Sequence, residues 1–201
     1  MDMSAMFKIG YGLYVLTAEE DGKDNGCIIN TAIQVTVNPN RVAVTVNKNN
    51  YTCRMIKRKK VFNISMLDET ASFEIFKHFG FVSGGSVDKF KDYTAFKRAE
   101  NGVSYITESV NAYISGKVVS EIDLGTHIMF IADVTDGKVL ADTKSLTYAY
   151  YHESIKPKPT ETEKKGGYRC KICGYVYEGE NMPDDFICPI CKHGKDDFEK
   201  I

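Results

Sequence analysis

The sequence predicts a mainly β protein, in which a β-barrel domain with a few helices is followed by a small metal-binding module. Seven segments before residue 141 are rich in Val, Ile, Tyr and Thr and are separated by turn residues. A polar stretch with two prolines and two glycines then covers residues 153–167. Two Cys-x-x-Cys pairs follow this stretch, over residues 170–173 and 188–191.

The expected secondary structure of the first domain is strands with two helices. The strands are expected at residues 11–18, 27–37, 41–47, 61–67, 103–108, 112–123 and 126–140. Residues 37–41 are typical of a turn, and Asp136-Gly137 suggests a tight turn between strand segments. One helix is expected from Thr52, and another over residues 70–80 ending at Gly80. Many strands with few helices suggest a closed antiparallel barrel.

The change in composition at residues 153–167 indicates a solvated linker. It separates a domain over residues 1–152 from one over residues 168–201. A domain of about 150 residues can bury roughly 68–70% of its unfolded surface, whereas a module below ~40 residues usually needs a staple. We therefore expect the second domain to require a bound metal in order to fold.

Charge and hydropathy exclude several classes of protein. The net charge of −1 gives no general attraction to nucleic acid or membrane. No apolar run approaches the ~18 residues of a membrane span, and residues 9–18 are typical of a first strand rather than of a signal peptide. Four of the six cysteines stand in the paired motifs, which points to a metal and a reducing cytoplasm. We expect Cys27 and Cys53 to be small buried hydrophobic residues.

The paired cysteines predict a tetrahedral metal site with four thiolate ligands: Cys170, Cys173, Cys188 and Cys191. An apolar shell is expected from the aromatic residues Tyr168, Tyr175, Tyr177, Phe186 and Phe198. Tetrahedral sulfur ligation suits zinc and iron equally well, so the spacing alone leaves the metal open.

The residues around the cysteines resemble rubredoxin. The motifs that show this resemblance are YRCKICGYVYEG at 168–179 and PDDFICPICKHGKDDFE at 183–199. The short segment between them is similar to the compact rubredoxin domain fused to rubrerythrins, and Phe186 stands where a tryptophan is usual. The resemblance implies a single iron that carries one electron.

A basic segment of the first domain predicts a phosphate site. Residues 46–60 contain six basic side chains and no acidic one, at the point where a strand passes into a helix. Helix N-termini favour phosphate, and Lys48 and Thr52 would add a charge and a hydroxyl. The alternative is an ordinary solvated basic helix face.

The order of motifs over residues 1–152 resembles the flavin reductase family with the FMN-binding split-barrel fold. The motifs are NTAIQVTVNPNRVAVTVNKNNYT, VFNISMLDE, FGFVSGGSVDKF and GTHIMFIADV. By resemblance, residues 30–34 would meet the isoalloxazine ring, residues 47–52 the phosphate, and residues 83–89 would form a loop near the flavin. The implied FMN-binding residues are Asn30, Thr31, Ala32, Ile33, Gln34, Asn47, Lys48, Asn49, Tyr51, Thr52, Ser83, Gly84, Gly85 and Lys89.

The resemblance also implies a catalytic role for His127, near the flavin or the nicotinamide. Without the resemblance, a histidine in the apolar segment HIMFIA is typical of a strand residue with satisfied hydrogen bonds. No G-x-G-x-x-G fingerprint is present, so NADH or NADPH would bind transiently over the flavin.

The two halves together resemble the high-molecular-weight rubredoxins of anaerobes. The resemblance implies electron transfer from NAD(P)H through FMN and iron to a flavodiiron protein that reduces oxygen or nitric oxide, and a homodimer. Two alternatives remain open. One is a free-flavin reductase with a structural zinc tail, and the other is an electron carrier whose flavin is reduced by another protein.

Overall fold

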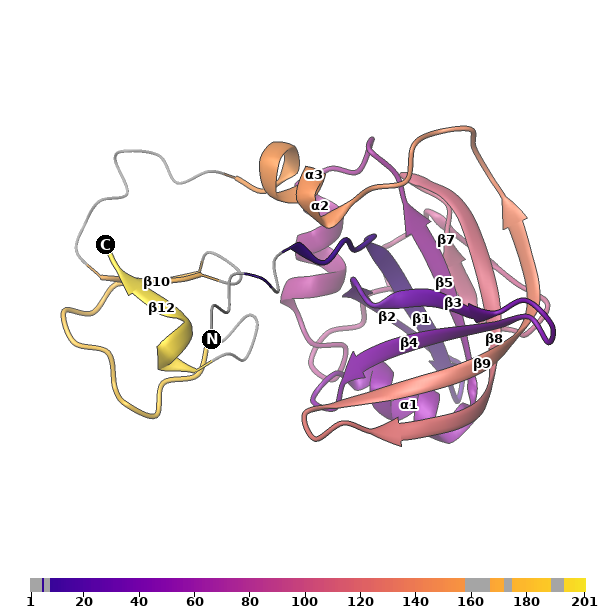
Figure 1. Cartoon of the computed structure of the whole chain (residues 1–201), viewed down its shortest axis with the longest axis horizontal. Helices are drawn as coiled ribbons and strands as arrows, with labels where there is room; N and C mark the ends of the chain where they lie inside the picture. The colour runs from indigo at the N-terminus through magenta and orange to yellow at the C-terminus, as the bar shows by residue number, and fades with distance from the viewer. Residues whose placement is uncertain (1–4, 6–7, 158–166, 172–174, 189–193) are drawn as a thin grey trace. The chain divides into compact units, whose positions relative to one another are not determined.

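The structure is a computed structural model, which describes residue 5 and residues 8–157, 167–171, 175–188 and 194–201. It divides into two units, residues 1–156 and residues 157–201 (Figure 1). Each unit packs around its own buried side chains.

Among residues 8–156, which the structure describes, the first unit has nine strands and three short helical regions. The strands are β1 (Tyr14–Glu20), β2 (Lys23–Ile29), β3 (Ala32–Thr36), β4 (Arg41–Asn47), β5 (Val61–Leu67), β6 (Phe96–Arg98), β7 (Ser104–Ile106), β8 (Val110–Asp123) and β9 (His127–Val139). The helical regions are α1 (Tyr51–Lys59), α2 (Phe73–Phe76) with the π-helix η2 (Lys77–Phe81), and α3 (Tyr148–Tyr150) with the π-helix η3 (Tyr151–Ile155).

Seven strands form one antiparallel sheet in the order β2-β1-β5-β8-β9-β4-β3. Its two outer strands are consecutive in the chain, since only Asn30 and Thr31 separate β2 from β3. The sheet must therefore curl until its edges approach at that corner (Figure 1). Because β2 and β3 do not pair, the barrel is split rather than closed by hydrogen bonds, and the expected single strand over 27–37 is wrong.

Other expected elements agree closely with the structure. The strands at 41–47 and 61–67 are confirmed as β4 and β5, and the two expected helices are α1 and α2 with η2. The turn expected at Asp136-Gly137 is wrong, because β9 continues through it. The register of β8 shifts between Ser115 and Gly116, opposite this point, so the local irregularity is a β-bulge.

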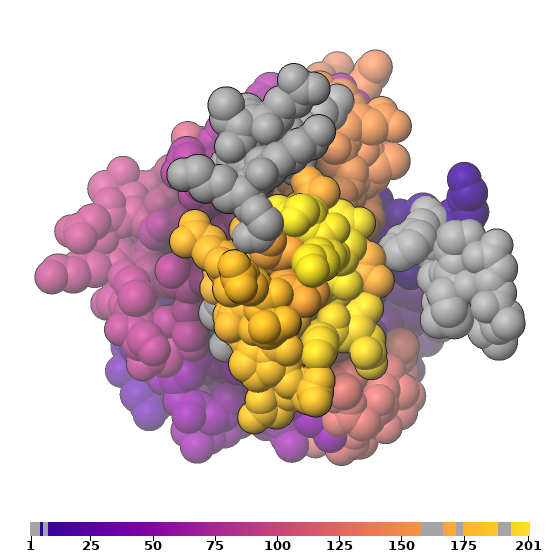
Figure 2. All heavy atoms as spheres, turned by 90° about the vertical axis from the view of Figure 1, so that its left-hand side faces the viewer, coloured from indigo at the N-terminus to yellow at the C-terminus, as the bar shows by residue number. Residues whose placement is uncertain are grey.

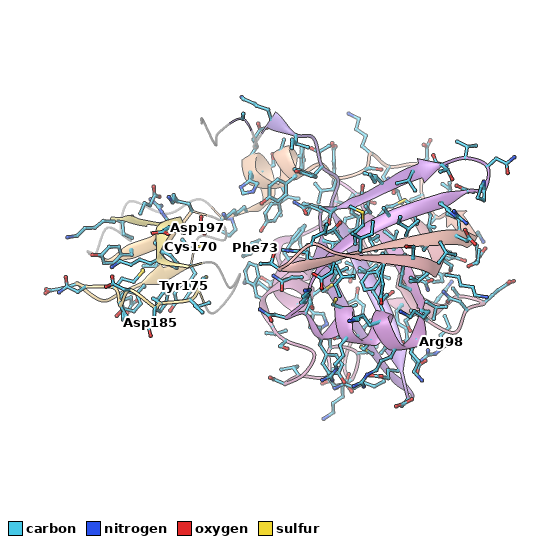
Figure 3. The ribbon with its side chains drawn as sticks, turned by 60° about the horizontal axis from the view of Figure 1, so that its bottom comes forward. Phe73, Arg98, Cys170, Tyr175, Asp185 and Asp197 are labelled. Carbon is cyan, nitrogen blue, oxygen red and sulfur yellow. The ribbon has the colours of Figure 1, made fainter. Side chains whose placement is uncertain are left out.

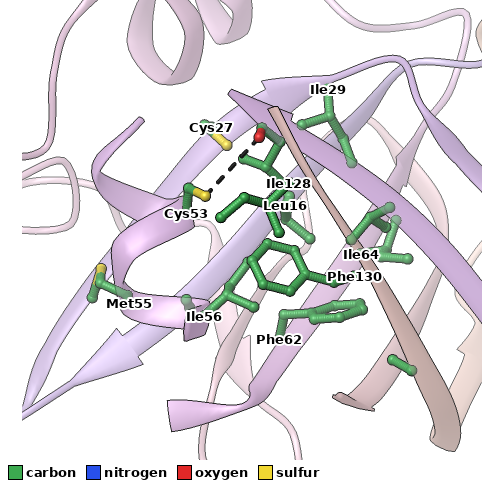
Figure 4. Close-up of a cluster of buried hydrophobic side chains, with 14 of the residues drawn as sticks. Leu16, Cys27, Ile29, Cys53, Met55, Ile56, Phe62, Ile64, Ile128 and Phe130 are labelled. Atoms are coloured by element: carbon green, nitrogen blue, oxygen red, sulfur yellow. Dashed lines mark hydrogen bonds between the residues drawn. The ribbon is translucent and has the colours of Figure 1, made fainter. Parts of the chain in front are cut away.

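The barrel interior holds one hydrophobic core, which α1 helps to fill (Figure 4). Leu16, Phe62 and Phe130 are each 0% exposed there. Met55 and Ile56 of α1 belong to the same cluster, so the helix is anchored by its apolar face. Anchoring of this kind fixes where the N-terminus of α1 lies.

A second core forms on the other side of β1. Val15 belongs to it, while the neighbouring Leu16 belongs to the barrel core, as the alternation of a strand requires. Phe76 and Phe79 from the α2–η2 region complete this second cluster together with Tyr151 of η3. The cluster thus holds α2 and η2 against the outside of the sheet.

The second unit contains a three-stranded sheet in the order β11-β10-β12. Its elements are β10 (Tyr168–Cys170), β11 (Val176–Tyr177), the 3₁₀ turn η5 (Lys195–Asp197) and β12 (Phe198–Lys200). Its described residues form a small cluster of side chains (orange to yellow in Figure 2).

Candidate functional site

Two of the four predicted metal ligands lie within the described residues. Cys170 ends β10, Cys188 belongs to the second pair, and their side chains are 1% and 0% exposed within one buried cluster. The N–H of Cys170 donates to the carbonyl of Tyr175 at 2.8 Å. Figure 3 labels both residues in the second unit. Cys173 and Cys191 lie outside the described residues. Sulfur from both motifs in one buried cluster fits a soft tetrahedral metal such as iron or zinc.

The predicted aromatic shell around these cysteines is confirmed. Phe198 is 9% exposed, and Tyr168, Tyr175, Tyr177 and Phe186 pack against the same cluster. The ring of Phe186 meets that of Phe198 edge-on at 5.5 Å between centroids. The sequence analysis missed Met182, which is 5% exposed in this cluster. An apolar shell of this kind keeps water away from the sulfur atoms.

The first unit brings the end of β4 and the start of β9 together. Asn47 lies opposite His127 in the β4–β9 ladder, and the N–H of Lys48 donates to the carbonyl of Thr126 at 3.0 Å. The hydroxyl of Thr126 lies 2.8 Å from Nδ1 of His127. The ammonium of Lys48 pairs with both oxygens of Asp123 at 2.6 and 2.7 Å, and its hydrogen bond lowers the pKa of that carboxyl. The charge expected for a phosphate at Lys48 is therefore compensated.

The N-terminus of α1 has free capacity for an anion. Its N-cap residue, Asn50, makes no side-chain capping bond, and the first turn has no acidic residue. Thr52 is 0% exposed, however, and its hydroxyl accepts a hydrogen bond from Nδ2 of Asn25 at 2.8 Å. The same hydroxyl lies beside Cys27, whose burial raises the pKa of its thiol. Thr52 thus uses its hydroxyl inside the protein rather than at the surface.

The loop that contains Gly84 and Gly85 packs directly on this corner. A Cβ atom at Gly84 would lie 2.0 Å from Oδ1 of Asn25, and one at Gly85 would lie 3.4 Å from the ring of Tyr51. The carbonyl of Gly84 accepts a hydrogen bond from the ammonium of Lys23 at 3.0 Å. Gly84 is therefore needed for the close approach of the loop to β2, whereas a side chain at Gly85 would make an ordinary contact with α1.

The segment 30–34 contributes to the wall of a cavity of about 270 Å³. This volume is slightly below the range of roughly 300–1,000 Å³ that is usual for small-molecule sites. Ala32, Ile33 and Gln34 line this cavity. The hydroxyl of Thr31 donates to the carbonyl of Thr45 at 2.7 Å, which ties the corner to β4. This segment is thus connected to the site through the strand that ends at Asn47.

Lys89 is placed differently from the other predicted residues. Its side chain is 2% exposed, and its ammonium donates to the carbonyls of Gly26 and Phe79 at 2.8 and 2.7 Å. Burial lowers the pKa of this ammonium to about 8. Lys89 therefore braces η2 against β2 from the inside. A larger cavity, of about 550 Å³, is lined by residues of the α2–η2 region and by none of the predicted flavin residues.

Three residues at this corner were missed by sequence analysis: Lys23, Asn25 and Arg54. Lys23 and Asn25 lie in the polar first half of β2, where turn residues hid the strand. Asn25 is 1% exposed, and its Oδ1 has no hydrogen-bond partner among the described residues. A ligand hydroxyl or N–H that reached this corner would satisfy that acceptor. The residues present thus fit a polyhydroxylated, phosphorylated ligand such as a flavin nucleotide.

The fold and these two sites define a flavoprotein barrel joined to a metal-sulfur module. Residues 6–158 match the family model described as flavin reductase like domain, and residues 168–199 match the rubrerythrin, rubredoxin-like domain. The chain belongs to the flavin reductase-like family and carries a rubredoxin-like domain after it.

The chain is similar over its full length to a high molecular weight rubredoxin of Moorella thermoacetica. The identity is 36% over 230 residues, which covers 100% of each chain. It is 40% identical over 162 residues to a ferric-chelate reductase (NAD(P)H) of Archaeoglobus fulgidus, covering 81% of this chain and 95% of the relative. Among solved structures, flavin reductase PheA2 is 28% identical with a TM-score of 0.60, covering 73% of this chain and 93% of that chain.

Membership of this family makes the protein an oxidoreductase, with a flavin supported for the first unit and iron for the second. The expected split-barrel fold with a rubredoxin-like module is confirmed. No helix among the described residues is long and apolar enough to cross a membrane.

Proposed function

We propose that the protein oxidises NADH or NADPH at FMN in its first unit and passes single electrons through iron in its second unit to an external acceptor. The observation that carries the proposal is the presence of a flavin reductase-like domain and a rubredoxin-like domain in one chain. When bound, the flavin exchanges two electrons with a nicotinamide and the iron exchanges one electron, so together they convert a pair of electrons into single ones.

The chain's own residues supply position and polarity for this chemistry. The N-terminus of α1 with Asn47, Asn49 and Tyr51 offers hydrogen-bond donors for a phosphate-bearing end. The corner at residues 30–34 offers the cavity for the ring. Thr126 orients the imidazole of His127 through Nδ1, and we infer that His127 positions the nicotinamide.

The metal proposal assigns one iron to Cys170, Cys173, Cys188 and Cys191. Two of these cysteines lie in one buried cluster, and the rubredoxin-like match includes all four positions. Metal analysis of protein from iron-replete anaerobic cells should find about one iron per chain and a red chromophore. If the protein contains only zinc and shows no red chromophore, the alternative of a free-flavin reductase with a structural zinc tail would be favoured.

The acceptor we propose is a flavodiiron-type protein that reduces oxygen or nitric oxide. A second candidate acceptor is a ferric chelate, because the relative from Archaeoglobus fulgidus that is 40% identical is a ferric-chelate reductase. That match covers 162 residues of this chain, so such a reaction would depend on the first unit. A variant without the iron site should therefore keep ferric-chelate reduction and lose delivery to the protein acceptor.

We also propose a cytoplasmic homodimer formed through β3. This outer strand exposes the large apolar side chains of Ile33, at 62%, and Val35, at 41%, and Val37, just beyond its end, is 78% exposed. An exposed apolar edge strand invites pairing with another chain. The cytoplasmic location is supported by the paired cysteines, which need a reducing compartment to remain thiolates.

The test of the proposed function is an anaerobic titration of purified protein with NADH and with NADPH. Flavin absorbance should bleach first, and the iron absorbance should follow without added mediator. A flavin that neither nucleotide reduces, but that a separate reductase does reduce, would support the electron-carrier alternative instead.

A further inference from the structure

Basic residues around α1 fall into two groups. Four of them pair with carboxylates: Lys48 with Asp123, Arg58 with Glu20, Lys59 with Asp21, and Lys60 with Glu121, at 2.6 to 3.2 Å. Lys23, Arg54 and Lys57 have no carboxylate within ion-pair distance among the described residues, and of these three Lys23 and Arg54 lie beside Tyr51. Their charges therefore remain available to an anion at the surface.

Lys23 and Arg54 are gathered on a single aromatic ring. The ammonium of Lys23 lies 5.1 Å from the centroid of the Tyr51 ring, and the guanidinium carbon of Arg54 lies 4.3 Å from it. Tyr51 is the first residue of α1, so both cations stand at the positive end of that helix. Two like charges held around one ring create a local excess of positive charge.

Hydrogen-bond donors remain unused on both cations. Lys23 spends one of its three donors on the carbonyl of Gly84. Arg54 makes no side-chain hydrogen bond among the described residues, so the whole fork of its guanidinium is available for bidentate binding of an oxyanion. The amides of the adjacent loop are occupied, since Gly85 and Ser86 donate to Ser83. Contacts to an anion here would thus come from the two side chains and from the N-terminus of α1.

The buried carboxamide of Asn25 is an independent sign of a ligand at this corner. It lies against Gly84, whose carbonyl holds Lys23, and its Oδ1 is buried without a partner among the described residues. Such an atom costs free energy unless a ligand or water satisfies it. The polar and the charged groups of the corner therefore point to one ligand that carries both hydroxyl groups and an anion.

We propose that Lys23 and Arg54, gathered on Tyr51, bind the phosphate group of the flavin, in place of the compensated Lys48. The inference rests on the proposed flavin site and deepens it. The phosphate monoester would lie between the two cations and supply the negative charge that no carboxylate of the described residues supplies. It would do so at the helix end that favours anions. The site consequently selects phosphorylated flavin over riboflavin.

The test measures dissociation constants of FMN and riboflavin by quenching of flavin fluorescence in full-length protein stripped of flavin. Arg54→Gln and Lys23→Gln should each weaken FMN at least about tenfold, or about 1.4 kcal/mol, and leave riboflavin within about twofold. The matched control is Lys57→Gln. Lys57 is exposed, lies one turn further along α1, and has no ion pair among the described residues, so it should leave both constants unchanged.

Three outcomes would overturn the inference. The first is an equal loss of affinity for FMN and for riboflavin in Arg54→Gln and Lys23→Gln. The second is an unchanged affinity for FMN in both variants. The third is a loss of the preference for FMN over riboflavin in Lys48→Gln alone. Failure of the proposed function is distinct from these, because the wild-type protein would then bind neither flavin. Circular dichroism of each variant confirms that the exposed substitutions leave the fold intact.

Discussion

Gly84 is the residue at which the loop around residues 83–85 packs tightly against Asn25 of β2. Its carbonyl holds Lys23, and its Cα faces the carboxamide of Asn25. Asn25 is buried and bonded to Thr52, so it has little room to retreat. The identity of one small residue thereby sets the distance between the loop and β2.

Gly84→Ala should therefore weaken flavin binding and stability together. The new Cβ would lie 2.0 Å from Oδ1 of Asn25, and overpacking of this kind costs roughly 1–3 kcal/mol. Flavin dissociation constants and urea unfolding measure the two effects. Gly10→Ala is the control, because nothing lies within 4 Å of the added Cβ there. Equal stability of the two variants would contradict the close approach.

The buried ammonium of Lys89 should make the free energy of unfolding depend on pH. Because burial disfavours the charged form, the pKa of Lys89 is about 8 in the folded protein. The pKa of a lysine in the unfolded chain is about 10.4. Between these values the unfolded chain binds a proton that the folded protein lacks. The free energy of unfolding should therefore rise with pH in this window, by up to about 3 kcal/mol.

The measurement is the difference in unfolding free energy between wild type and Lys89→Met, by urea denaturation from about pH 7.5 to about pH 10.5. Wild type should gain relative to the variant as pH rises. Lys57→Met, at an exposed lysine, should show no such gain. A difference that stays constant with pH would mean that Lys89 keeps its proton throughout.

At the level of elements, local chemistry predicted some strands well and misled at others. β4 and β5 were predicted with their observed ends, because each is a compact run of β-branched and apolar residues between turn residues. The polar half of β2 was missed because Lys23 to Asn25 carry loop-like side chains in a strand paired with β1. The break at Asn30-Thr31 is set by closure of the barrel, which no local pattern records.

The candidate site shows the same division. The phosphate site expected at residues 47–52 rests on a basic run at a strand-to-helix junction, which has a direct electrostatic meaning, and it stays a prediction. The pairing of Lys48 with Asp123, and the gathering of Lys23 and Arg54 on Tyr51, depend on which distant strands become neighbours. The sequence therefore indicates where positive charge gathers, and tertiary contacts decide which of these charges remain unpaired.

β3 carries a prediction of its own. Val35 is 41% exposed on the outer strand of the sheet, so a lysine there is tolerated by the monomer and repels an identical strand. Val35→Lys should shift the protein from dimer to monomer in sedimentation-velocity experiments. The control Val139→Lys changes a residue that is 75% exposed on β9 and should leave the dimer intact. A monomeric wild-type protein would instead remove the proposed role of β3.

At the scale of the whole molecule, the chain links two units that each have buried clusters of their own. The first unit has two cores of its own, so it does not need the metal to fold. The roughly 10 residues between Lys156 and Gly167 have the polar composition of a linker, for which a coil reach of roughly 16–19 Å and an effective concentration near the millimolar range are expected. Electron transfer between the two redox sites is therefore expected.

Cys188→Ser separates the roles of the two units. Cys188 is 0% exposed in the small cluster of the second unit, and a hydroxyl is a poorer ligand than a thiolate for iron. The iron should be lost and the second unit should unfold, since metal binding supplies most of its folding free energy. The flavin in the variant should still be reduced by NADH at the wild-type rate, because the first unit is untouched.

Delivery of electrons to a flavodiiron-type acceptor should fall to the background rate, measured anaerobically with purified acceptor. Ile187→Ser, at the adjacent residue that is 60% exposed, keeps every ligand and should retain the iron. Full-rate delivery by Cys188→Ser would place the second unit off the electron path and favour the free-flavin reductase alternative.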